Sequence, residues 1–314
     1  MSGPSPAPPP DPARFAVHRA VVRDDLELAY VHEGRGGFPL LLVHGWPETS
    51  RIWWRNIEPL ARAGFEVIAP DLRGFGGSGL AADGCYDLAA HARDLHALGD
   101  VLGHERCVAA GGDLGGGVIV DLGLRFPGFV ARQVLFNCVL PILPEAYTAA
   151  GIDPAPSGEV RQAADYYVRQ GRDADALAAE LDDPARRRRY VREFYGHRFW
   201  AAPGTFSAEE AAFMAEPFGD AAKLRASFGN YESALGTRPL SETPRFFEPS
   251  PVPTVALYGP EDHVLFRDFP ERCEVAFPDL VGPFVVPRAG HFLQWERADL
   301  LNATLAAFCR DLLG

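Results

Sequence analysis

The fold is decided by one stretch of the sequence, Val108-Ala109-Ala110-Gly111-Gly112-Asp113-Leu114-Gly115-Gly116-Gly117-Val118. A short apolar run enters it, a turn crowded with glycines holds a single acid, and the helix-like segment Val118–Leu124 leaves it. Glycines on both sides of Asp113 remove side chains that would clash in a sharp strand-to-helix turn. The pattern predicts a tight turn that presents one carboxylate at a strand end. Its ordinary alternative is an aspartate that caps a helix.

Outward from this turn, short apolar runs alternate with helical segments. We expect strands at Leu26–Val31, Pro39–Val43, Glu66–Ala69, Cys107–Ala110, Ala131–Phe136, Pro253–Tyr258 and Pro283–Val286, and helices at Ile52–Ala63 and Leu88–Leu102. The runs at Pro39–Val43 and Val108–Ala110 do not alternate with polar residues, which is typical of strands buried on both faces of a parallel sheet. The order of elements predicts an α/β fold with a doubly wound, mostly parallel sheet.

The pattern changes after about Leu140 and returns near Pro253. Between them the chain lacks strong strand runs and is helical and charged, most clearly at Ala174–Leu181 and Pro184–Phe194. A helical insertion is expected to lie over the carboxyl ends of the strands, where open α/β sheets bind ligands. The predicted parts are a disordered, Pro-rich tail (1–13), an α/β core (14–140 and 246–314) and a helical cap, or lid (141–245).

Composition points to a small-molecule ligand. The chain of 314 residues carries a formal net charge of −12, which disfavours nucleic acid and anionic membrane surfaces. No apolar run approaches the roughly 18 residues that span a bilayer, and the N-terminus lacks the basic and apolar regions of a signal peptide. Five scattered cysteines without metal-type spacing fit free thiols in a reducing, cytoplasmic setting. We expect no metal site.

Three further segments supply candidate partners for Asp113. His44-Gly45-Trp46-Pro47 follows a buried strand, and a tight turn there exposes backbone N–H groups. Asp262 follows a later strand in a Gly/Pro turn, and His291 follows the last strand-like run. Each of these alone has an ordinary structural explanation as a turn or surface residue. Together they give the chain order nucleophile, acid, histidine at successive strand ends, which is far more specific than any part.

At these residues the chain resembles the epoxide hydrolase family of the α/β-hydrolase superfamily, which is related to the haloalkane dehalogenases. The matching motifs are His44-Gly45-Trp46-Pro47, Asp71-Leu72-Arg73-Gly74-Phe75-Gly76-Gly77-Ser78, Gly111–Gly115, Asp262-His263-Val264-Leu265 and Gly290-His291, within a resemblance over about residues 14–313. The resemblance implies that Asp113 is the nucleophile and that His291 and Asp262 activate water. It also implies that two cap tyrosines bind and protonate the epoxide oxygen.

The resemblance assigns one of these tyrosines to Tyr231, in Phe228-Gly229-Asn230-Tyr231-Glu232. For the other we favour Tyr166 over its neighbour Tyr167, because adjacent helix positions point about 100° apart and only one is expected to reach the pocket. Packing between helices is the alternative role for both. We expect the backbone N–H groups of Trp46 and Leu114 to form an oxyanion hole, and Trp46, Tyr166 and Tyr231 to bind substrate.

An aspartate at this turn restricts the chemistry independently of the resemblance. A nucleophile that attacks a saturated carbon becomes alkylated, so a serine would be left as an ether that water cannot hydrolyse. An aspartate is left as an ester, whose carbonyl water can attack. Asp113 therefore points to epoxides or haloalkanes, and no Gly-x-Ser-x-Gly occurs elsewhere in the sequence.

The expected reaction converts a small apolar epoxide and water to a vicinal diol, without a metal or organic cofactor. A haloalkane dehalogenase is the main alternative, but relatives carry His and Trp around the nucleophile where this chain has Gly112 and Leu114. Leucine cannot hold a halide as an indole N–H does. Leu114 and Gly117 are likewise not the arginines of fluoroacetate dehalogenases. A non-catalytic ligand-binding protein of the same fold stays open, as do a monomer and a homodimer.

Overall fold

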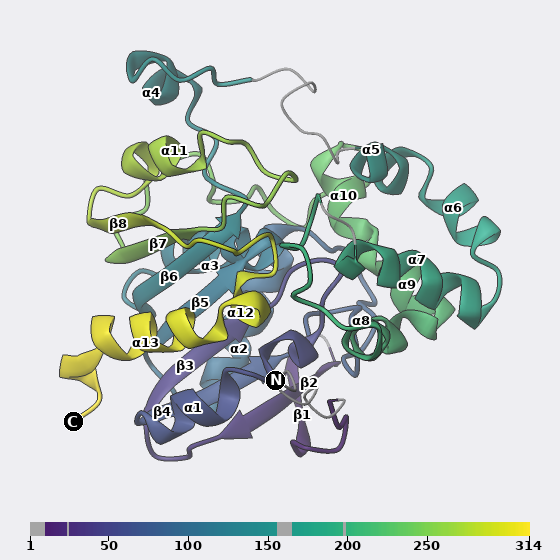
Figure 1. Cartoon of the computed structure of the whole chain (residues 1–314), viewed down its shortest axis with the longest axis horizontal. Coiled ribbons are helices and arrows are strands. Elements are labelled where there is room, and N and C mark those ends of the chain that lie inside the picture. The colour runs from purple at the N-terminus through teal and green to yellow at the C-terminus, as the bar shows by residue number, and fades with distance from the viewer. Residues whose placement is uncertain (1–9, 24, 156–164, 197–198) are drawn as a thin grey trace, which may run out of the picture.

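The computed structural model describes residues 10–23, 25–155, 165–196 and 199–314, which form a central sheet with helices on both sides (Figure 1). The sheet has eight strands in the order β1-β2-β4-β3-β5-β6-β7-β8. β1 and β4 pair antiparallel with β2, and the remaining pairs are parallel. The predicted mostly parallel sheet is therefore confirmed. Its strands are β1 (Val17–Arg23), β2 (Leu26–Glu33), β3 (Phe38–Val43), β4 (Phe65–Pro70), β5 (Cys107–Gly112), β6 (Val130–Cys138), β7 (Thr254–Tyr258) and β8 (Leu280–Val285).

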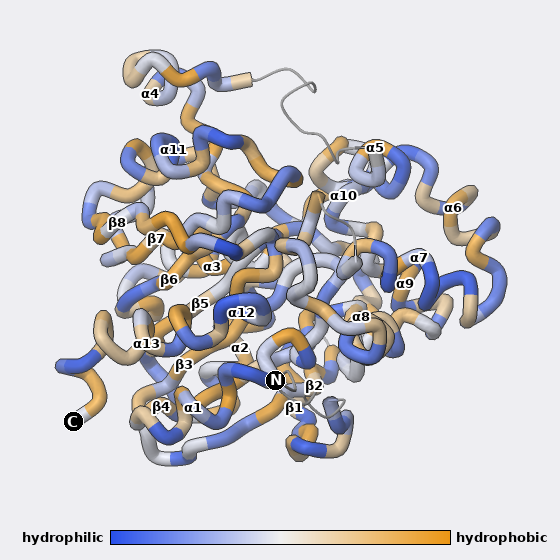
Figure 2. Tube along the Cα trace, viewed as in Figure 1, coloured by the Kyte–Doolittle hydropathy of each residue, from blue (hydrophilic) through white to orange (hydrophobic). Residues whose placement is uncertain are grey.

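Helices cover the two faces of this sheet. In Figure 1, α1 and α13 lie in front of the sheet, and α2 and α3 lie behind it. Figure 2 shows the hydrophobic residues concentrated along the central strands. The core helices are η1 (Ser50–Trp53), α1 (Ile57–Arg62), α2 (Leu88–Leu102), α3 (Asp113–Arg125), α11 (Phe269–Ala276), α12 (Leu293–Glu296), α13 (Ala298–Phe308) and η4 (Arg310–Leu312).

Local signals explain why α2 has the bounds that the sequence predicted. The side chain of Asp87 accepts a hydrogen bond from the N–H of Ala90 and so caps the first turn. Gly103 ends the helix with φ of +80°, a conformation that glycine adopts without strain. β1, in contrast, was not predicted. It is an edge strand whose residues are exposed or half-buried, so its apolar signal is weak.

A compact group of helices projects from the core between β6 and β7 (Figure 1). These cap helices are α5 (Asp165–Arg172), α6 (Ala174–Glu180), α7 (Pro184–Gly196), α8 (Ala208–Ala215), η3 (Glu216–Gly219), α9 (Ala221–Ser227) and α10 (Gly229–Ala234). The predicted insertion at 141–245 also contains α4 (Pro144–Ala149), which lies apart from them beside α11. The cap helices therefore occupy only part of the predicted range.

The predicted N-terminal tail is described only from Pro10 onward. The carbonyl oxygen of Asp11 accepts a hydrogen bond of 3.1 Å from the indole of Trp54, and Phe15 packs edge-on against the same indole. Residues 10–13 are thus attached to the core and do not form a free tail. Within the described ranges, no helix is both long and apolar enough to cross a membrane.

Candidate active site

Asp113 lies at the junction of β5 and α3, in the strained turn that the glycines predict. Its φ is +48°, in the left-handed region that few residues other than glycine, asparagine and aspartate adopt. The turn packs tightly against β3: a Cβ atom on Gly111 would lie 2.7 Å from the carbonyl oxygen of Val43, and one on Gly115 only 2.2 Å from it. Glycine is required at both positions, and the side chain of Asp113 is held at the strand end.

Two backbone N–H groups face the carboxylate of Asp113. The N–H of Trp46 donates to Oδ1 at 2.7 Å, and the N–H of Leu114 also bonds to the carboxylate. A Cβ atom on Gly45 would lie 2.4 Å from that of Asp113, so a residue without a side chain is needed there. Burial favours a higher pKa for Asp113, but His291 and the two N–H groups outweigh it and lower the pKa. Asp113 is therefore a carboxylate at neutral pH.

His291 lies between the two acids. Its Nδ1 is 2.8 Å from Oδ2 of Asp262, and its Nε2 is 3.2 Å from Oδ2 of Asp113. Burial alone lowers the pKa of His291, but the carboxylates of Asp262 and Asp113 outweigh burial and raise that pKa well above its usual value. The structure thus brings together the three residues that the sequence singled out from distant segments. Removing the charge of Asp113 lowers the pKa of His291 again, because one of its two acidic partners is lost.

Asn137, at the end of β6, holds the carboxylate of Asp262 in place. This role was not predicted from the sequence. Its Nδ2 donates to Oδ2 of Asp262 at 2.9 Å and to the carbonyl of Gly259 at 3.0 Å. Its Oδ1 accepts from the N–H of Gly259 at 2.7 Å. With φ of +37°, Asn137 adopts a conformation that asparagine tolerates better than most residues. An asparagine directly after a buried apolar run is the signal that could have revealed it.

Glu48 joins the turn beside the nucleophile to the helix after the histidine. Its Oε2 accepts from the N–H of Gly45 at 2.6 Å, and its Oε1 accepts from Nε2 of Gln294 at 2.6 Å. Burial raises the pKa of Glu48 to about 7, and the negative charge of Asp113 adds to the shift. The sequence pattern places Glu48 after the Trp-Pro turn but does not indicate this connection.

Glu296 joins the histidine segment to the cap. Its Oε2 accepts from the N–H groups of Gly290 at 2.9 Å and Ala202 at 2.8 Å, and its Oε1 accepts from the N–H of Phe292 at 2.9 Å. Gly290 and Phe292 flank His291, whereas Ala202 belongs to the segment between α7 and α8. Glu296 was also missed in the sequence, because three of its four hydrogen-bond donors are backbone N–H groups, which leave no pattern; the fourth is the hydroxyl of Thr205.

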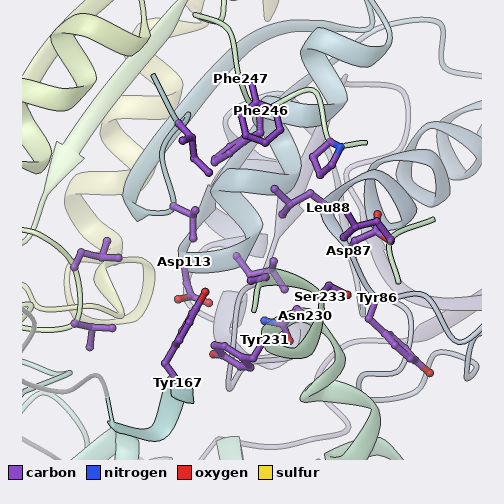
Figure 3. Close-up of a pocket in the computed structure, with 18 of the residues that line it drawn as sticks. Tyr86, Asp87, Leu88, Asp113, Tyr167, Asn230, Tyr231, Ser233, Phe246 and Phe247 are labelled. Atoms are coloured by element: carbon purple, nitrogen blue, oxygen red, sulfur yellow. The ribbon is translucent and has the colours of Figure 1, made fainter. Parts of the chain in front are cut away.

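A pocket of about 350 Å³ opens beside Asp113, between the core and the cap helices (Figure 3). Its walls are formed by Tyr86, Asp87, Leu88, Asp113, Leu114, Val139, Ile142, Tyr166, Tyr167, Asn230, Tyr231, Ser233, Ala234, Leu240, Pro244, Phe246, Phe247, Val264 and Leu265. The expectation that only one of Tyr166 and Tyr167 reaches the pocket is wrong, since both line it. An arc of 100° on a helix surface fits within a single pocket wall.

Of the four tyrosines in the pocket wall, the three from the cap helices, Tyr166, Tyr167 and Tyr231, differ in their surroundings. The ring of Tyr166 stacks on Trp46 with centroids 5.5 Å apart and meets the ring of Tyr231 edge-on at 5.7 Å. Tyr166 and Tyr231 are buried, whereas Tyr167 is half-buried. Burial raises the pKa of Tyr231 well above its usual value, and Tyr166 and Asp113 raise it further. Tyr231 is therefore a neutral hydrogen-bond donor at any working pH.

The side chain of Trp46 does not line the pocket, contrary to the prediction that it binds substrate. It is fully buried, lies behind Tyr166 and Tyr231, and donates from its Nε1 to the hydroxyl of Ser227 at 3.1 Å. Its contribution at Asp113 comes from the backbone N–H. The indole positions the two tyrosines instead of contacting the pocket contents.

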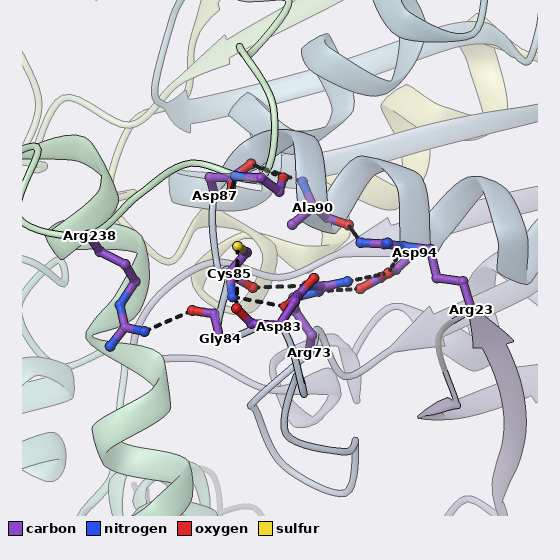
Figure 4. Close-up of polar contacts among 10 residues, drawn as sticks. Arg23, Arg73, Asp83, Gly84, Cys85, Asp87, Ala90, Asp94 and Arg238 are labelled. Carbon is purple, nitrogen blue, oxygen red and sulfur yellow. Dashed lines mark hydrogen bonds and ion pairs between the residues drawn. The ribbon is translucent and has the colours of Figure 1, made fainter.

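A buried ionic cluster supports the pocket wall at Tyr86 and Asp87 (Figure 4). Arg73 donates to both oxygens of Asp94, from Nε at 2.5 Å and from Nη2 at 2.7 Å. It also donates from Nη1 to the carbonyl of Cys85 at 2.9 Å. From the cap side, Arg238 donates to the carbonyl of Gly84 at 2.8 Å. The segment before α2 is therefore held from both sides.

The chain is similar to known proteins of one fold family. Residues 39–298 match the family described as alpha/beta hydrolase fold. Epoxide hydrolase 4 of Mus musculus is 23% identical over 288 residues, covering 91% of this chain and 77% of that protein. Epoxide hydrolase A of Mycobacterium tuberculosis is 34% identical over 174 residues, covering 54% of this chain and 52% of that protein.

Solved structures agree on the fold. The structure of epoxide hydrolase CorEH without ligand superposes with a TM-score of 0.79 at 23% identity, covering 95% of this chain and all (100%) of that chain. At this level of identity, the structural likeness shows a shared fold.

Proposed function

The chain belongs to the alpha/beta hydrolase fold family, and we propose that it is an epoxide hydrolase that forms a vicinal diol through an ester on Asp113. One observation carries the proposal: the strained turn holds a buried aspartate in place of a serine, 3.2 Å from the histidine and beneath two tyrosines in one pocket. The epoxide hydrolases among the relatives from mouse and Mycobacterium tuberculosis support the same reaction.

In the first half-reaction, an oxygen of Asp113 attacks one carbon of the oxirane ring, and the carbon–oxygen bond on that carbon breaks. Negative charge develops on the ring oxygen as it leaves. We assign Tyr166 and Tyr231 as the donors to that oxygen, because both line the pocket with Asp113 and both are buried. Tyr167 also lines the pocket and meets the ring of Tyr231 at 5.2 Å, but it is half-buried. A tyrosine hydroxyl supplies the proton that converts the alkoxide to the first hydroxyl of the diol.

In the second half-reaction, His291 removes a proton from water, and the resulting hydroxide attacks the carbonyl carbon of the Asp113 ester. Asp262 holds the ring of His291 and stabilises its charged form. The N–H groups of Trp46 and Leu114 stabilise the oxyanion of the tetrahedral intermediate, an effect worth about 3–4 kcal/mol for one donor in other enzymes. When the intermediate collapses, the ester carbon–oxygen bond breaks, and the departing alkoxide takes the proton from His291 to become the second hydroxyl of the diol. The remaining acidic proton of Asp113 returns to the tyrosinate, which regenerates both the carboxylate and the tyrosine. No step uses a metal or an organic cofactor.

The pocket favours an epoxide over a haloalkane. Leu114 offers no side-chain donor to a leaving halide, and the indole N–H of Trp46 is bonded to Ser227. The tyrosine hydroxyls suit an oxygen leaving group that must gain a proton. A non-catalytic ligand-binding role has no need of a histidine held by one acid and facing another. We also place the enzyme in the cytoplasm, which its free cysteines support.

The decisive experiment is a panel of aryl and alkyl epoxides and matched haloalkanes, assayed for diol and for halide. The proposal predicts diol from the epoxides. Halide release without any diol formation would replace the proposal with a dehalogenase. A single turnover in ¹⁸O-labelled water then tests the covalent route. Because water attacks the ester carbonyl, the label is expected in the carboxyl group of Asp113 and not in the first equivalent of diol.

A further inference from the structure

The pocket beside Asp113 has two walls of opposite character (Figure 3). One wall is apolar and is formed by Val139, Ile142, Leu240, Phe246 and Phe247. The other is one face of α10, where Asn230, Tyr231, Ser233 and Ala234 line the pocket. Residues spaced by three and four positions share a face of a helix, so Asn230 and Ser233 stand together beside Tyr231.

Two polar atoms of this second wall lack partners in the described part of the chain. Oδ1 of Asn230 and the hydroxyl of Ser233 are both buried and make no hydrogen bond there. A serine within a helix commonly bonds to a backbone carbonyl one turn earlier, but Ser233 does not. Buried polar groups in folded proteins are nearly always paired, so two orphans beside the catalytic pocket call for an external partner.

We propose that Asn230 and Ser233 form a subsite for a hydroxyl group on the substrate, and that the enzyme acts on epoxides carrying a hydroxyl close to the oxirane ring. A hydroxyl can donate to Oδ1 of Asn230 and accept from the hydroxyl of Ser233, which complements both orphan atoms. Asn230 directly precedes Tyr231, the assigned donor to the oxirane oxygen, so one small substrate reaches both. This inference rests on the proposed epoxide hydrolase function.

The apolar wall completes the match. Val139, Ile142, Leu240 and Phe247 are 41%, 54%, 45% and 57% exposed, so the apolar wall extends to the solvent-accessible rim of the pocket. A substrate with a hydroxyl on one side of the oxirane and a hydrocarbon chain on the other fits with its polar arm on α10 and its chain toward this rim. The two walls thereby orient the oxirane relative to Asp113.

The test compares 2,3-epoxyhexan-1-ol with 2,3-epoxyhexane in the wild type, Asn230→Leu and Ser233→Ala. The quantity measured is the ratio of kcat/KM for the epoxy alcohol to kcat/KM for the epoxyalkane. Taking this ratio within one preparation cancels any loss of folded enzyme, and comparing it between variants cancels the intrinsic reactivity of the two epoxides. We expect the ratio to fall about three- to tenfold in each variant, the effect of one lost hydrogen bond.

Leu240→Ala, on the apolar wall, is the matched control. In this variant we expect kcat/KM to fall for both epoxides and their ratio to stay as in the wild type. An unchanged ratio in both Asn230→Leu and Ser233→Ala overturns the subsite. If Asn230→Leu does not fold, Ser233→Ala alone decides. A wild type that forms diol from neither epoxide contradicts the proposed function itself, which separates the two failures.

Discussion

Asn137 and Asp262 share a hydrogen bond of 2.9 Å at the same oxygen, Oδ2, that lies 2.8 Å from Nδ1 of His291. Oδ2 of Asp262 thus accepts hydrogen bonds from both the side-chain amide of Asn137 and the imidazole of His291. The other oxygen of Asp262 accepts from the N–H of Val264 at 2.7 Å. With both oxygens bonded, the carboxylate cannot rotate, and the imidazole that it holds keeps its Nε2 toward Asp113. The predictions for the reaction follow from this fixed geometry.

His291→Gln is expected to separate the two half-reactions. The nucleophile is still present, so the ester forms, but no base remains to activate water. The whole-protein mass should increase by the mass of the epoxide and stay increased. Release of diol at the wild-type rate from this variant would contradict the assignment of His291 as the base.

Asp113→Ala should lower kcat by about 10,000-fold or more, as removal of a nucleophile does in other hydrolases. No mass increase should appear with the epoxide, in contrast to the histidine variant. Cooperative urea unfolding serves as the control for folding. Full activity in Asp113→Ala would exclude the covalent mechanism.

The tyrosines should respond in order of their burial and contacts. Tyr166→Phe and Tyr231→Phe each remove a donor to the leaving oxygen, and the rate of ester formation should fall roughly 10- to 100-fold in each. Tyr167→Phe, at the half-buried neighbour, should change the same rate less than about threefold. Rapid-quench measurement of the ester isolates this step. The reverse order would move the catalytic role from Tyr166 to Tyr167.

Glu48 should make stability depend on pH. Its pKa is raised from 4.5 to about 7 in the folded chain. The protonated form is therefore favoured by folding, and this contribution is complete below pH 4.5, declines as pH rises and is lost above about 7. The full contribution is on the order of 3 kcal/mol.

Glu48→Gln removes the titrating carboxyl group, so it should abolish the part of the fall in the free energy of unfolding with pH that Glu48 causes. Urea unfolding at pH 5, 6, 7 and 8 gives the free energy of unfolding for both proteins. Their difference isolates Glu48, because Glu296 titrates similarly in both. Parallel curves for the two proteins across this range would refute the prediction.

Asp94→Ala should destabilise the chain by about 3 kcal/mol, because Arg73 would lose its buried carboxylate partner and keep only Asp83, whose side chain is 38% exposed. The control is Glu27→Gln, which breaks the half-exposed pair with Arg19 and should cost less than about 1 kcal/mol. The free energy of unfolding in urea gives both values. Equal effects in the two variants would show that the buried cluster adds no special stability.

The sequence was a good guide where a local signal coincides with a chemical need. The glycines around Asp113 follow from the close approach to β3, and Asp262 and His291 follow strand ends in the expected chain order. These features need no knowledge of distant contacts. The helix predicted at Leu88–Leu102 likewise matches the bounds of α2.

It was a poor guide where partners are distant backbone groups or neighbouring helices. Asn137 bonds to Asp262, which lies more than one element away along the chain, and Glu296 bonds to backbone N–H groups. No residue spacing in the sequence indicates either contact. The side chain of Trp46 was expected in the pocket, but Tyr166 and Tyr231 cover it. Which face of a cap helix meets the core depends on packing between helices, which a single sequence does not contain.

The hydrogen bonds of Glu296 make the two sides of the cap mechanically unequal. Near His291, any movement of Ala202 away from the core breaks its hydrogen bond to the Glu296 carboxylate, which also holds Gly290 and Phe292. At the rim formed by Ile142 and Phe247, exposed apolar side chains can rotate without such a loss. We therefore expect reactant and product to exchange at that rim, without disturbing the alignment of the proposed general base between turnovers.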